Sequence, residues 1–164
     1  MRGVSVLALL LLSMPVLAAE EPSGCDKFKW NIDRERAALT ASDRTRLTPG
    51  AELNVLPASG VILSLAAPAE AKLPTPPEGG TFAGFASFKA APKAGVYTIS
   101  LSAGAWIDVL QDGDFVKPMG FSGAKDCEGI RKTIKYELSA KPFVLQVSGS
   151  RQDSISIAVL PSGE

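Results

Sequence analysis

The chain has 164 residues, and its 17 basic and 17 acidic side chains balance to a net charge of zero. This length suits one ordinary domain with a sizeable core, and the neutral balance argues against a nucleic-acid partner, which needs a basic surface. The chain has no histidine, which excludes histidine-based triads, histidine-ligated zinc and the iron site made of two histidines and a carboxylate.

Residues 1–19 have the three parts of a secretion signal. Arg2 supplies the positive charge, an apolar run follows at 4–12, and small residues precede the first acidic ones. We expect cleavage after Ala18 or Ala19, the alternative being an uncleaved anchor. The run is shorter than the ~20 apolar residues that cross a membrane. The sequence therefore predicts a periplasmic or secreted protein with no membrane span after cleavage.

Cys25 and Cys127 are the only cysteines. In an oxidising compartment an even number of cysteines favours a disulfide. A metal or redox pair would need histidines or closely spaced cysteines, and the sequence offers neither. We predict one structural disulfide that closes a loop of roughly a hundred residues, and we expect no cofactor.

The polar segment 20–50 contains one predicted helix, at residues 31–41. Ile32 and Leu39 share a face of this helix, so we expect the helix to lie on a larger body. Trp30, just before it, is expected to pack the segment onto the same body.

From residue 51 onward, short strands alternate with turns rich in glycine and proline, such as Asp112-Gly113 and Ser122-Gly123. The proline-rich connection 68–80 is expected to run extended between sheets, a partner-docking strip being the alternative. The predicted class is all-β, a single antiparallel β-sandwich over 51–164, with jelly-roll and immunoglobulin-like topologies both open. The predicted strands are 54–56, 61–65, 82–88, 96–101, 105–110, 115–116, 130–138, 143–148 and 155–160.

Trp106 and Asp108 alternate onto one face of the strand 105–110. If that face is internal, Asp108 needs a partner, and Lys132 is the candidate. If it is external, Trp106 and Asp108 form a small ligand-binding platform, as in many carbohydrate-binding sandwiches. The plainer alternative is a solvent-facing Asp108 beside a partly buried Trp106. We interpret Lys132, together with Arg131 and Lys135, as a solvated basic strand face.

Asp108, Asp112 and Asp114 lie around the end of the same strand. Clustered aspartate oxygens can hold calcium, but Asp112-Gly113 is also a strong hairpin signal and the spacing is not that of an EF-hand. We interpret the cluster as a turn and expect no metal. A carboxylate-dependent hydrolase would need Asp108 and one of Asp112, Asp114 or Asp126 to converge in a cleft.

Three stretches, 95–101, 105–113 and 141–149, resemble strands of the bacterial pre-peptidase C-terminal type of β-sandwich, over about residues 82–160. Nearly the whole mature chain resembles small exported bacterial proteins with no established activity. These begin Cys-Asp-Lys-Phe-Lys-Trp, here 25–30, and contain Ala-Trp-Ile-Asp-Val and Asp-Cys-x-Gly-x-Arg-Lys, here 105–109 and 126–132. Such chains are sometimes labelled homogentisate 1,2-dioxygenase, but the iron of that enzyme is held by histidines, which this chain lacks.

The leading hypothesis is an exported, non-catalytic β-sandwich that binds a small ligand or an envelope partner, either a glycan or a protein. One alternative is a carboxylate-dependent, glycan-active hydrolase. The other is a purely structural envelope protein, which predicts no pocket and no exposed aromatic side chain near Asp108. The sequence leaves the oligomeric state open.

Overall fold

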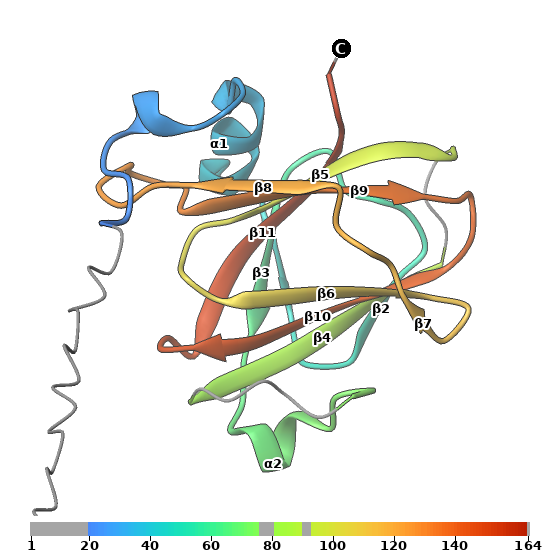
Figure 1. Ribbon diagram of the computed structural model, residues 1–164. Helices are drawn as coiled ribbons and strands as arrows, with labels where there is room; N and C mark the ends of the chain where they lie inside the picture. Colours follow the sequence, from blue (N-terminus) through green and yellow to red (C-terminus); the bar gives the residue numbers. More distant parts are fainter. Residues whose placement is uncertain (1–19, 76–80, 90–92, 164) are drawn as a thin grey trace, which may run out of the picture.

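Two β-sheets face each other in the computed structural model, which describes residues 20–75, 81–89 and 93–163 (Figure 1). The all-β sandwich that the sequence predicts is confirmed. The six-stranded sheet has the order β1 (Thr45–Leu47), β3 (Val61–Ser64), β11 (Ser154–Pro161), β5 (Gly95–Leu101), β9 (Lys132–Leu138) and β8 (Gly120–Gly123). The five-stranded sheet has the order β2 (Ala51–Leu53), β4 (Phe82–Phe88), β10 (Phe143–Ser150), β6 (Trp106–Gln111) and β7 (Asp114–Phe115).

Both sheets are mixed, so the prediction of a purely antiparallel sandwich is wrong at two pairs. β1 runs parallel to β3, and β2 runs parallel to β4. The cause is the chain path, because β1, β2, β3 and β4 alternate between the two sheets. A chain that crosses to the opposite sheet and then crosses back re-enters the first sheet in its original direction, so its two strands in that sheet are parallel. The other strand pairs are antiparallel.

The main core lies between the sheets and follows the two-residue period of the strands. Ile107 and Val109 of β6 point inward, where they meet Leu145 and Val147 of β10 and the facing side chains of the other sheet. Phe88 and Phe143 stack in this core with ring centroids 4.7 Å apart. Truncating a buried phenylalanine typically costs about 3–5 kcal/mol. Because a slip of one residue would turn these side chains out of the core, the inner faces fix the register of both sheets.

A second, smaller core lies on the outer side of the six-stranded sheet, beneath helix α1 (Asp33–Thr40). Ile32 and Leu39 are buried there against Ile130 and Ala158. The helix predicted at 31–41 and its packing face are therefore confirmed, with slightly shorter bounds. Figure 1 shows α1 above this sheet and α2 (Pro68–Ala71) beneath the five-stranded one.

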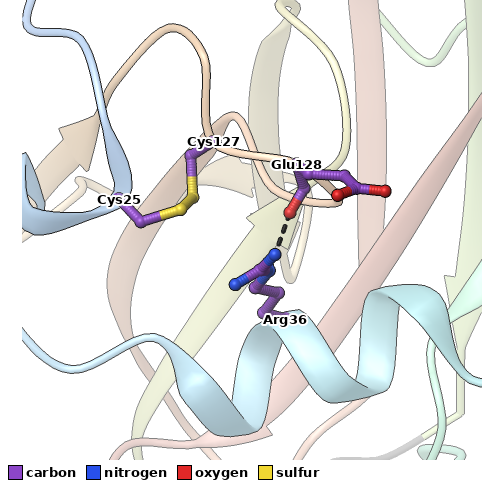
Figure 2. Close-up of a disulfide and its surroundings, with 4 residues drawn as sticks. All are labelled: Cys25, Arg36, Cys127 and Glu128. Carbon is purple, nitrogen blue, oxygen red and sulfur yellow. Dashed lines mark hydrogen bonds between the residues drawn. A yellow bond between two sulfur atoms is a disulfide. The ribbon is translucent and has the colours of Figure 1, made fainter.

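The predicted disulfide between Cys25 and Cys127 is confirmed (Figure 2). It joins the 3-10 helix η1 (Cys25–Lys27) to the loop between β8 and β9. Close to it, the Arg36 side chain of α1 donates a hydrogen bond from Nε to the Glu128 carbonyl at 2.7 Å. The bridge thus holds the N-terminal segment against the sandwich.

Several element boundaries differ from the predictions. No strand covers 54–56, and β2 lies just before it. The predicted Ser122-Gly123 turn is wrong, because both residues belong to β8. Segment 20–50, which the sequence sets apart, contributes β1 to the six-stranded sheet.

The connection 68–80 crosses from β3 in one sheet to β4 in the other, as expected, but it contains α2 instead of being extended throughout. Its residues 76–80, like the predicted secretion signal at 1–19, lie outside the described residues. Among the helices of the described ranges, none has the length and apolar character that a membrane crossing requires.

Candidate functional site

Trp106 is the first residue of β6 and is 61% exposed. Because Ile107 and Val109 face the core, alternation places Trp106 and Asp108 on the outer face of the five-stranded sheet. Asp108 is only half-buried there, opposite the buried Gln146 of β10. An exposed tryptophan at a sheet end leaves a large apolar ring in water, which is typical of a contact surface.

Lys132, the first residue of β9, lies beside this ring. Its Nζ is 5.2 Å from the centroid of the Trp106 ring and 3.4 Å from the Ala105 carbonyl, to which it donates. Burial lowers the pKa of the Lys132 ammonium, the positive Arg131 next to it lowers it further, and Asp108 acts in the opposite direction. The structure therefore brings Lys132 to Trp106 as a half-buried cation over an aromatic face.

A pocket of about 510 Å³ opens at this end of the sandwich, where β8 ends and β6 and β9 begin. We call it the aromatic–cationic pocket. Phe121 of β8 is its second aromatic side chain, 63% exposed, with the Lys29 Nζ 5.2 Å from its ring centroid. The lining residues are Glu21, Pro22, Lys27, Lys29, Gly104, Ala105, Trp106, Phe121, Ser122, Gly123, Arg131, Lys132 and Gly149.

The N-terminal segment supplies one wall of the pocket, and hydrogen bonds hold it next to β8. The Lys29 amide donates to Ser122 Oγ at 2.8 Å. The Gly24 amide donates to the Lys125 carbonyl at 2.8 Å, and the Lys125 amide donates to the Pro22 carbonyl at 2.7 Å. Together with the disulfide, these bonds bring residues 21–29 to the pocket from about a hundred positions away in the sequence.

Arg131 forms an ion pair with Glu21 inside the pocket. The hydrogen bond that Arg131 donates holds the pKa of the Glu21 carboxyl below its usual range. The interpretation of Arg131, Lys132 and Lys135 as a solvated strand face is therefore wrong. All three are half-buried, and the Lys135 Nζ lies 4.7 Å from the ring centroid of Trp30, which packs at the second core as predicted.

The remaining aspartates lie elsewhere. Asp112 and Gly113 both have positive φ, 54° and 88°, and form the two-residue turn that joins β6 to the antiparallel β7, as the turn interpretation predicts. The Asp112 carboxylate pairs with Lys141 at 2.9 Å. Asp114 is exposed in β7, and Asp126 accepts a hydrogen bond from the Ser23 hydroxyl beside the disulfide.

Across the described residues, no group of three or more histidine, cysteine, aspartate or glutamate side chains is placed to hold a metal ion. Among the described residues that line the aromatic–cationic pocket, Glu21 is the one carboxylate. The arrangement can stack a flat ring on Trp106 and surround a negative group with ammonium and guanidinium donors.

Sequence reasoning found Trp106 and Lys132 but missed Phe121, Lys29 and Glu21. The signal that could have found them is the disulfide, since a Cys25–Cys127 bridge brings the residues on either side of both cysteines together. Comparison with protein-family models, with curated proteins and with solved structures finds no match.

Proposed function

We propose that this chain is an exported, non-catalytic β-sandwich that binds a small ligand or an envelope glycan in the aromatic–cationic pocket. The export part of the proposal rests on the N-terminal signal pattern, and the disulfide is compatible with it. The resemblances to pre-peptidase C-terminal sandwiches and to small exported bacterial proteins accord with this proposal.

The observation that carries the binding proposal is the pair of exposed aromatic rings, each with a lysine ammonium against it, inside one pocket. Trp106 with Lys132 and Phe121 with Lys29 share this geometry, with both ammonium groups 5.2 Å from the ring centroids. Ligand sites are concave, have aromatic walls and carry a few polar groups that converge. A volume of about 510 Å³ falls in the size range of such sites.

Binding is favoured over glycan hydrolysis by the distribution of carboxylates. Hydrolysis requires two carboxylates that flank the scissile bond at a defined separation. Asp108 lies on the outer face of β6, Asp112 in a hairpin and Asp126 beside the disulfide. Binding is favoured over a purely structural role by the pocket and by the exposed Trp106.

The test is a screen of glycans and envelope extracts against the exported protein, followed by titration of each hit with Trp106→Ala. Loss of a central aromatic contact typically costs more than 1 kcal/mol, so we expect binding to weaken about tenfold. The matched control is Phe115→Ala, because Phe115 is 58% exposed and does not line the pocket. Equal weakening by both variants, or no hit for the wild-type protein, would contradict the proposal.

A further inference from the structure

The charge of the aromatic–cationic pocket is unlike that of the whole chain. Four of its lining side chains are cationic, namely Lys27, Lys29, Arg131 and Lys132, against the single lining carboxylate of Glu21. Lys27 is paired with Asp26, which does not line the pocket, at 2.7 Å, so an excess of two positive charges remains. The complete chain has equal numbers of basic and acidic side chains. A local excess of positive charge in a concave site attracts anions and concentrates them there.

Arg131 already holds a carboxylate in this pocket, and that carboxylate belongs to the chain itself. Glu21 lies 110 positions before Arg131, and its contact with the guanidinium is the pocket's internal ion pair. Guanidinium groups bind carboxylates with matched planar geometry. The Glu21 carboxylate therefore marks the position that a ligand carboxylate would occupy.

The Glu21 side chain can leave this position without undocking the segment. The backbone attachment begins one residue later, where the Pro22 carbonyl accepts the Lys125 amide, and it continues through the Gly24 amide and the disulfide at Cys25. Both partners of the ion pair are partly exposed. Exposed ion pairs of this kind contribute little to stability, so replacing the Glu21 carboxylate at Arg131 by an external anion costs little free energy.

Trp106 supplies the other half of the recognition. Its exposed indole offers a flat apolar face, with Lys132 at one side and Arg131 next in the chain. A pyranose ring has an apolar face that packs on such a surface, and a uronic acid carries a carboxylate on the same ring. One uronic acid residue therefore combines the two features that Trp106 and Arg131 recognise.

We propose, on the basis of the proposed function above, that the pocket binds an acidic saccharide of the uronic acid class, and that the ligand carboxylate displaces Glu21 from Arg131. Trp106 stacks on the sugar ring, Arg131 receives the carboxylate, and Lys132 and Lys29 add positive charge at the sides. Glu21 then acts as an internal competitor that weakens binding until an external carboxylate replaces it.

The experiment measures binding of a galacturonate oligosaccharide to the exported protein by calorimetry at low salt, with the methyl-esterified oligosaccharide as the uncharged ligand of the same ring. We expect Glu21→Gln to bind the acid about two- to fivefold more tightly, the size of an exposed ion pair. Arg131→Gln should bind it at least tenfold more weakly. The matched control is Glu20→Gln, which removes the same charge next door, because no ion pair of the described residues includes Glu20.

The proposal is supported if Glu21→Gln binds the acid more tightly while Glu20→Gln does not, and if the wild-type protein binds the ester more weakly than the acid. Equal affinity for acid and ester, equal effects of the two glutamate variants, or no binding of the acid by wild-type protein overturns it. Benzoate serves as a carboxylate without a sugar, and equally tight binding of benzoate also overturns the saccharide assignment. The broader binding function fails separately, when Trp106→Ala matches the wild-type protein against every ligand of the screen.

Discussion

The disulfide allows the most direct quantitative prediction about this fold. Cys25 and Cys127 are separated by 102 positions, so their bond restricts most of the unfolded chain. The loop-entropy model assigns a closed loop of this length about 4.7 kcal/mol, and measured losses on removing native bridges are about 2–5 kcal/mol. We expect the Cys25→Ala/Cys127→Ala double variant to lose about 2–5 kcal/mol of unfolding free energy.

The assay is urea unfolding of the wild-type protein and of the double variant, followed by circular dichroism. A shift of the midpoint with an unchanged m-value identifies a change of stability in a two-state transition. Arg36→Gln is the control for local attachment, because Arg36 ties α1 to the same loop through the Glu128 carbonyl (Figure 2). We expect this variant to lose about 1 kcal/mol, the typical net value of one hydrogen bond.

The reasoning fails if the double variant loses no more than Arg36→Gln at equal m-values. That result would mean that the bridge acts only as one more local contact between the N-terminal segment and the β8–β9 loop, and not as a restraint on the unfolded chain.

Two further predictions concern stability. Gly60→Ala places a Cβ 2.8 Å from the Ala38 carbonyl oxygen and 2.9 Å from that of Ile157, so we expect the free energy of unfolding in urea to fall by about 1–3 kcal/mol. The control is Gly104→Ala, whose Cβ meets nothing within 4 Å and which should leave stability unchanged. Equal stabilities of the two variants would show that the backbone yields at Gly60. Burial, assisted by Asp108, raises the pKa of Tyr136 to about 12. Because an unfolded tyrosine ionises near pH 10, the unfolded state releases its proton first as the pH rises. The contribution of Tyr136 to the free energy of unfolding is therefore fully present below about pH 10 and is lost as the pH rises to about 12. Tyr136→Phe should remove that part of the pH dependence, and an unchanged slope would contradict the assignment.

The sequence predicted the strands best where one face is buried along the whole strand. Residues 82–88 coincide with β4, and 143–148 and 155–160 fall inside β10 and β11. Alternation is strong in these strands because their inner side chains form the core. β8 has the sequence Gly-Phe-Ser-Gly and lies at a sheet edge, so its glycines have the composition of a turn and only its pairing with β9 makes it a strand.

The site was predictable only in part, because its two halves come from distant segments. Trp106 and Lys132 carry their own signals, an aromatic residue and a cation at the starts of strands. Lys29 and Glu21 have no local pattern that points to a pocket, and their position depends on the disulfide and on the pairing of residues 22–24 with Lys125. Long-range pairing of this kind is set by the complete fold and not by local composition.

The strand order also determines when this protein can fold. β10 is the central strand of the five-stranded sheet, and β11 lies between β3 and β5 in the six-stranded one (Figure 1). Both come later in the chain than the strands on either side of them. Without β10, the strand that joins β4 to β6 is missing, and without β11, the strand that joins β3 to β5 is missing, so neither sheet can be completed before these two strands are present.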